Sequence, residues 1–245
     1  GMFLVLRRLS MIGDTLSHVT IAGVALGFLM NFYPLAAGLL FALIAAFAIE
    51  WLRKAYKTYA ELSIAIMMSG GVALASLFFT LGMNLNMNVM SYLFGSIYTL
   101  NRSDLWVVLA VTCSVLLIVC LLYKEMFLLT FDEDSAAVNG LPVRSLNMVV
   151  TVMTALVISV SIKIMGALLI SALLTVPAAC SLTLSKGFKS SLIIAVAVSE
   201  TAVATGLLSA GFWNLAPGAT VVLLLIACLI ALIVISFLTK RRITV

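Results

Sequence analysis

Charged residues are scarce in this sequence: 64% of its 245 residues are hydrophobic and only 9% are charged. Soluble domains carry about 25% charged residues, so a fold that packs in water is excluded and a lipid bilayer is the expected solvent. The formal net charge is +5. Because Lys and Arg fall in small clusters between apolar runs, and not in a basic arm, this charge does not indicate nucleic-acid binding.

Cysteine, histidine and enzyme motifs are also scarce. The four cysteines, Cys113, Cys120, Cys180 and Cys228, lie within apolar runs and form no CxxC pair, so we expect small core residues and no disulfide scaffold. There is one histidine. The sequence has no Walker A motif, no HExxH and no GxSG-like turn, which argues against an ATPase or an intramembrane protease and leaves no catalytic candidate.

Long apolar runs dominate what remains, and a spanning helix needs about 20 such residues. We therefore predict an all-α, polytopic membrane helical bundle, with residues 1–245 forming one transmembrane domain. The first eight residues are too short for a signal peptide, and we expect a further helix to precede them. Residues 82–100 are mixed and are predicted to form a re-entrant or interfacial turn. The eight predicted spans are 15–30, 34–52, 61–81, 104–123, 145–162, 167–185, 190–211 and 217–238.

The basic residues predict an orientation. If the Arg7/Arg8 end is cytoplasmic and the chain alternates through eight spans, only Arg102 and Lys163 of the 14 Lys and Arg residues fall outside. This asymmetry agrees with the positive-inside rule.

Small residues and one proline predict how the helices pack. Gly23 and Gly27 form a GxxxG pattern, and Gly206 with Ala210 or Gly211 repeats the theme in the seventh span, so close helix contacts are expected there. Pro177 removes a backbone hydrogen bond and should kink or unwind its helix.

One polar cluster lies at the start of the first span. Asp14 and His18 are four residues apart, so they share one face of a helix. A carboxylate and an imidazole together suit zinc, manganese or iron. Two other interpretations remain open: a buried His–Asp hydrogen bond, or an Asp that caps a helix beginning at Thr15. A two-fold partner could supply a second pair.

Other charged residues lie in or near the spans. Glu200 is intramembrane, so it is a candidate metal ligand, but hydrogen bonding to neighbouring helices or facing an aqueous cavity are alternatives. Lys163 is expected to extend toward the interface. Glu50 and Glu61 bracket a basic turn and are expected to be solvated or paired with its bases.

The segment from Phe131 to Arg144 is the most polar run. Acidic residues from Asp132 to Asp134 followed by Gly140 predict the start and stop of one short helix. The helix is either an ordinary interfacial element or a docking element for a cytoplasmic partner.

Together these segments resemble the permeases of bacterial zinc and manganese ABC importers, most closely the ZnuB/AdcB type. The resemblance covers nearly the whole chain. It is carried by residues 7–10, 13–18, 23–25, 91–96, 132–143, 161–169, 173–179 and 217–220.

The resemblance implies two permease copies around a central pathway, two cytoplasmic ATPase subunits beneath and an extracytoplasmic metal-binding protein above. It implies that Asp14 and His18 lie on the metal's route, whereas Glu200 matches no family motif. Gly166 and Pro177 lie in matched segments, and we expect them to have structural roles. Family members begin about one helix earlier. The 131–143 loop resembles the helix that couples permease to ATPase, with Phe131, Asp132, Ser135, Ala136, Ala137 and Gly140 as its expected coupling residues.

The predicted function is passage of Zn²⁺ across the cytoplasmic membrane. The segment from Leu16 to Thr20 favours zinc over manganese or iron. No covalently bound cofactor is expected, and ATP would be used by the partner. An importer of metal chelates, such as siderophores or a vitamin, and a purely structural membrane subunit are the alternatives.

Overall fold

The computed structural model describes residues 1–56, 59–82, 92, 95, 102–185, 187–213 and 215–243, without the side chains of residues 60, 103, 168 and 239–243. Within these ranges every regular element is an α-helix, which confirms the all-α prediction. The helices are α1 (Met2–Leu6), α2 (Ile12–Leu29), α3 (Pro34–Ala55), α4 (Ala60–Leu81), α6 (Arg102–Leu121), α7 (Tyr123–Phe131), α8 (Glu133–Val138), α9 (Val143–Met165), α10 (Ala167–Leu184), α11 (Phe188–Trp213) and α12 (Pro217–Ile243).

All eight predicted spans are helices, with ends within a few residues of the predicted ones. Seven are long and apolar enough to cross a membrane, namely α2, α3, α4, α6, α9, α11 and α12. α10 is apolar but shorter, at Leu169–Leu184. The turn predicted at residues 82–100 lies outside the described residues, apart from Gly82, Tyr92 and Gly95. α7 was not predicted, because its sequence continues the hydropathy of the preceding span.

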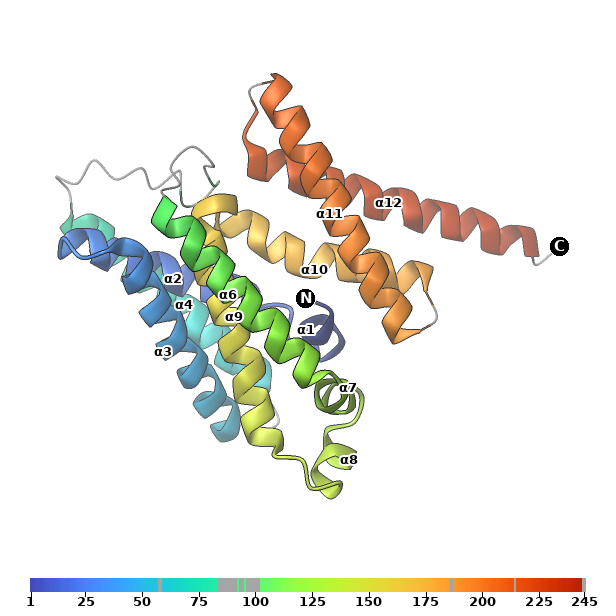
Figure 1. The fold of residues 1–245 in the computed structure, drawn as a ribbon, viewed down its shortest axis with the longest axis horizontal. Coiled ribbons are helices and arrows are strands. Elements are labelled where there is room, and N and C mark those ends of the chain that lie inside the picture. Colours follow the sequence, from blue (N-terminus) through green and yellow to red (C-terminus); the bar gives the residue numbers. More distant parts are fainter. Residues whose placement is uncertain are drawn as a thin grey trace. The chain divides into compact units, whose positions relative to one another are not determined.

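The helices form two compact units: residues 11–170, and residues 1–10 together with 171–245. In the first unit α2 is the central helix and packs against α3, α4 and α9. Figure 1 shows α6 and α3 each running beside α9 in this unit. Burial of α2 follows from its composition, because it is apolar on nearly every side and needs protein neighbours around it.

Glycines set the closeness of α2 and α3. A Cβ built at Gly23 would lie 2.7 Å from the carbonyl oxygen of Ala37, and one built at Gly38 would lie 2.8 Å from Cγ2 of Val24. A side chain at either position would push the helices apart. The GxxxG pattern therefore serves helix packing within one copy of the chain, as its spacing predicts.

The second unit contains α11 and α12, which pack against each other. Their contact includes Gly206, where a Cβ would clash with Val221. The small residues of the seventh span therefore have the packing role that was predicted for them.

Gly166 lies at the junction of α9 and α10, and Pro177 lies within α10. Gly166 ends α9 with φ +79°, a backbone conformation that side-chain-bearing residues rarely adopt. α10 continues through Pro177, so the expected unwinding does not occur there. The predicted structural role of Gly166 is thus a sharp helix end.

Candidate functional site

Asp14 and His18 project from α2. The helix begins at Ile12, so Asp14 lies in its first turn, where the helix dipole favours a negative charge. Between Ile12 and Ala25, all residues except Asp14 and His18 are buried. The side chains of Asp14 and His18 keep 30% and 27% of their surface exposed. These two polar groups are therefore the open positions of an otherwise buried stretch.

The geometry of the pair argues against both alternative interpretations. Nε2 of His18 lies 3.8 Å from Oδ1 of Asp14, which is too long for a hydrogen bond. Neither side chain is buried. Asp14 is not the cap of α2, because the helix starts before it and its N-cap is Met11. What remains is a partly exposed carboxylate and imidazole one helical turn apart on α2.

A groove lies beside His18. It has a volume of about 480 Å³ and lies between α2 and α4, with His18 and Ile21 on one side. Its α4 side is lined by Val72, Ala75, Ser76, Phe79 and Thr80. α2 and α4 are in direct contact about one turn before His18, where Oγ1 of Thr15 donates a hydrogen bond of 3.3 Å to the carbonyl of Ile64. The imidazole therefore borders an open space and is not sealed inside the unit.

The described residues of one chain do not by themselves form a complete metal site. Among the described residues, no group of three or more His, Cys, Asp and Glu side chains could hold a metal ion. Glu200 is exposed on α11, which belongs to the other unit. Its assignment as a ligand stays a prediction.

The polar loop folds as predicted into one short helix, α8. Asp132 is its N-cap: Oδ1 accepts a hydrogen bond of 2.8 Å from the backbone N–H of Ser135, and Oδ2 accepts one of 2.5 Å from the Ser135 hydroxyl. The backbone N–H of Gly140 donates to the carbonyl of Ala137, and Gly140 has φ +78°. The local start and stop signals therefore define this helix.

α8 is held on one side and exposed on the other. Ala136 is fully buried, whereas Ala137 is exposed and Val138 is 88% exposed. Phe131, the last residue of α7, is 58% exposed. The loop therefore presents apolar side chains on a polar segment, which is typical of a docking surface.

Comparison with known proteins agrees with this arrangement. The family described as "ABC 3 transport family" matches residues 1–237. The chain belongs to this family. It is 34% identical to a "Probable metal transport system membrane protein" of Treponema pallidum over 99% of this chain and 91% of that protein. It is 29% identical to the "High-affinity zinc uptake system membrane protein ZnuB" of Haemophilus influenzae, with the same coverage.

Two further relatives extend the comparison. The "Manganese transport system membrane protein MntC" of Halalkalibacterium halodurans is 26% identical over 91% of this chain and 76% of that protein. The solved structure "PsaBC from Streptococcus pneumoniae in complex with Fab" matches with a TM-score of 0.82 and 27% identity, over 95% of this chain and 83% of that one. The predicted resemblance is confirmed, and this ABC-type permease is a multi-pass protein of the bacterial cell membrane.

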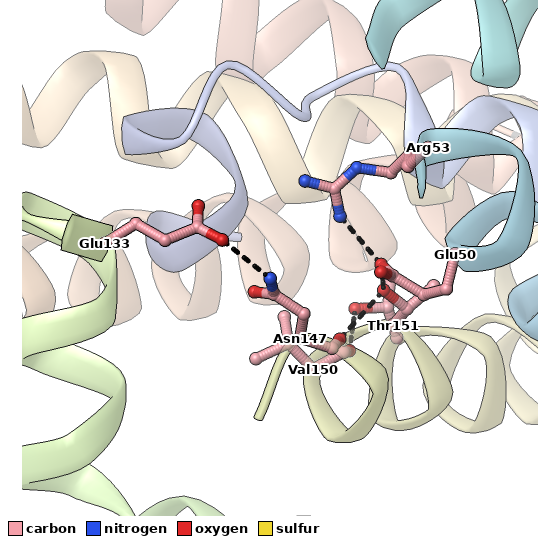
Figure 2. A network of polar contacts seen from close by, with 7 residues as sticks. Glu50, Arg53, Glu133, Asn147, Val150 and Thr151 are labelled. Atoms are coloured by element: carbon pink, nitrogen blue, oxygen red, sulfur yellow. Dashed lines mark hydrogen bonds and ion pairs between the residues drawn. The ribbon is translucent and has the colours of Figure 1, made fainter. Parts of the chain in front are cut away.

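The permease also contains a buried polar network that the sequence did not predict (Figure 2). The carboxylate of Glu50, on α3, accepts hydrogen bonds of 2.7 Å from Nη1 of Arg53 and from Oγ1 of Thr151 on α9. Nδ2 of Asn147, one turn earlier on α9, donates a 3.0 Å hydrogen bond to Oε1 of Glu133 on α8. Glu50 is paired with a base of its own turn, as expected, but it is buried and also joined to a distant helix.

Lys163 makes a second contact that the sequence did not predict. Its Nζ lies 2.6 Å from Oδ2 of Asp104, in an ion pair between α9 and α6. The Tyr33 hydroxyl also donates a hydrogen bond to Asp104. Asp104 falls at the predicted start of a span, and its acidity inside an apolar run was the signal that could have suggested a buried partner.

Proposed function

We propose that this permease conducts divalent transition-metal ions, zinc first, and that Asp14 and His18 hold the ion transiently on its way through. The observation that carries the proposal is the exposure of this pair on the otherwise buried stretch from Ile12 to Ala25, with His18 beside the groove between α2 and α4. An imidazole nitrogen and a carboxylate oxygen are donors that zinc and manganese accept.

The incomplete donor set supports a shared site. A tetrahedral zinc site needs four ligands, and Asp14 and His18 would supply two from each chain. In a two-fold dimer of permeases the second copy contributes its own Asp14 and His18, which completes four donors. A site divided between two subunits also releases its ion when the subunits move apart. Glu200 remains a further candidate donor.

The energy for transport comes from a partner in this proposal. The chain has no Walker A sequence, so two cytoplasmic ATPase subunits hydrolyse ATP, and an extracytoplasmic metal-binding protein delivers the ion. α8 and the exposed Phe131 and Val138 form the surface on which the ATPase docks. ATP-driven closure of the ATPases moves α8, and the pathway opens alternately to each side.

The choice of zinc over manganese rests on resemblance to zinc uptake permeases. Relatives are named for both ions, and both ions accept the same donors. An importer of metal chelates is the second candidate. Free Zn²⁺ and Mn²⁺ would stimulate ATP hydrolysis by an ion importer reconstituted with its ATPase and binding protein, whereas a chelate importer would need the chelate.

The test is the metal content of cells that express the permease with its partners. We expect His18→Ala to abolish the uptake of Zn²⁺ while the ATPase still co-purifies with the permease. Met30→Ala is the matched control, since Met30 lies at the other end of α2 with 69% of its surface exposed. Unchanged uptake by the His18 variant would remove this residue from the route, and accumulation of manganese alone would reverse the order of the two ions.

A further inference from the structure

The network around Glu50 joins three helices of the unit that carries the candidate metal pair. Glu50 is 6% exposed, and its carboxylate is shared by Arg53 on the same helix and by Thr151 on α9. Asn147 then joins α9 to Glu133 in the first turn of α8. Hydrogen bonds therefore link α8 to α9 and, one turn further along α9, link α9 to α3 (Figure 2).

The hydroxyl of Thr151 lies between Glu50 and the backbone carbonyl of Asn147. Its Oγ1 lies 2.7 Å from Oε1 of Glu50 and 3.1 Å from the carbonyl oxygen of Asn147. A hydroxyl has a single proton to donate, so the two acceptors compete for it, and the charged carboxylate at the shorter distance holds it here. A shift of α9 against α3 would redirect the hydroxyl of Thr151 from Glu50 to the carbonyl of Asn147 on its own helix.

The network is only partly satisfied. Within the part of the chain that the structure describes, Oδ1 of Asn147 and Nε of Arg53 are buried without a hydrogen-bond partner. Such groups are costly in a region of low dielectric, and apolar residues of the same shape would give a more stable contact. The network is therefore poorly explained as a device for stability alone, and its spare donor and acceptor allow a second set of partners.

α3 also packs against α2, the helix that carries the candidate site. α3 approaches α2 closely at Gly23 and Gly38. α2 carries Asp14 and His18.

We propose that Asn147, Thr151 and Glu50 form the joint that converts movement of α8 into movement of α3 and, through it, of the metal-holding pair on α2. The inference rests on the proposed function, in which α8 docks the ATPase. These three are positioning residues: they touch neither the ion nor ATP. Removing the joint uncouples ATP hydrolysis from transport without preventing either the assembly of the complex or the binding of the ion.

The test uses the full transporter, reconstituted in vesicles with its ATPase and its metal-binding protein. The quantity measured is Zn²⁺ transported per ATP hydrolysed. Asn147→Leu and Thr151→Val replace polar groups with apolar ones of similar shape, and each should lower this ratio about tenfold. Thr154→Val is the matched control, because the hydroxyl of Thr154 donates to the carbonyl of Val150, one turn back on the same helix. Its ratio should equal that of the unmodified permease.

A spin label supplies a readout that does not depend on transport. The label is placed at Val138→Cys, at an 88% exposed position on α8, after the four native cysteines are replaced by alanine. It is read in the permease without its ATPase, because Val138 lies on the proposed docking surface. Asn147→Leu should increase the mobility of the label, and Thr154→Val should leave it unchanged. Thr151→Ser keeps the hydroxyl and should restore the transport ratio even if Thr151→Val lowers the yield of folded protein.

The outcomes separate the joint from the proposed function. If the Asn147 and Thr151 variants transport as much Zn²⁺ per ATP as the Thr154 control, the joint is disproved while the proposed function stands. The same holds if Thr151→Ser folds but stays uncoupled. If the unmodified permease neither retains the ATPase nor responds to Zn²⁺, the proposed function itself fails.

Discussion

Nζ of Lys163 lies 2.6 Å from Oδ2 of Asp104, and this ion pair joins two membrane helices, α9 and α6. The side chain of Asp104 is almost completely buried and also accepts a hydrogen bond from Tyr33. The acid and the base lie 59 residues apart in the sequence. A charge in such a place is stable only while its partner is present.

Removing one member of this pair should destabilise the permease strongly. Lys163→Met leaves the Asp104 carboxylate buried without its cation, which costs about 3–5 kcal/mol. The double variant Asp104→Leu/Lys163→Met should recover most of this loss, because no charge is left buried. Thermal unfolding of the purified permease in detergent measures both effects. Arg102→Met, at an exposed position at the start of α6, is the control, and equal melting temperatures for all variants would contradict the prediction.

The contact between α2 and α3 should not accept a methyl group. Gly23→Ala would place a Cβ 2.7 Å from the backbone oxygen of Ala37, and separating the helices should cost about 1–3 kcal/mol. Gly70→Ala on α4 is the matched control, since no atom lies within 4 Å of its Cβ position. Unfolding of both variants in detergent tests this. A Gly23 variant as stable as the Gly70 variant would show that the helices can repack.

Acidic pH should weaken the contribution of the Asp132 N-cap to the stability of α8, whereas alkaline pH should leave it unchanged. The pKa of the Asp132 carboxyl is lowered, first by the hydrogen bond from the Ser135 hydroxyl and then by that from the Ser135 backbone N–H. A lowered pKa means that the contribution of the cap to stability is fully present above the ordinary value, about 3.9, and is lost as pH falls through the lower folded value. The cap is therefore intact throughout the neutral range.

Ser135→Ala tests this assignment. Loss of the hydroxyl hydrogen bond should raise the pKa of Asp132 toward its ordinary value. Carboxyl carbon chemical shifts of Asp-labelled permease, followed as pH is lowered, measure the change. Ser145→Ala, at an exposed serine in the first turn of α9, should leave this titration where it is. A titration of Asp132 that does not move in the Ser135 variant would assign its pKa to another cause.

The exposed apolar tip of α8 should matter for binding the ATPase and not for folding. Val138 is 88% exposed, so Val138→Asp removes few internal contacts but places a charge where the partner is proposed to pack. We expect the variant to melt at the same temperature as the unmodified permease and to lose most of the co-purified ATPase. Val138→Ala should keep more of the ATPase than Val138→Asp, and full retention by the Asp variant would move the docking surface elsewhere.

The sequence by itself determined the features that depend on local pattern. Apolar runs give eight helices because a bilayer requires length and hydropathy that can be counted along the chain. The α8 helix was predictable because Asp132 and Gly140 satisfy its ends from within a few residues. The shared face of Asp14 and His18 follows from helical periodicity alone.

Only the tertiary structure decided which buried charges meet. Glu50 and Thr151 are 101 residues apart, and Lys163 on α9 pairs with Asp104 on α6, 59 residues away. The exposure of the Asp14–His18 pair likewise depends on α3, α4 and α9 covering the other sides of α2. Such pairings depend on how helices pack, and packing in lipid is set by shape and by small residues on several helices at once, which no single segment specifies.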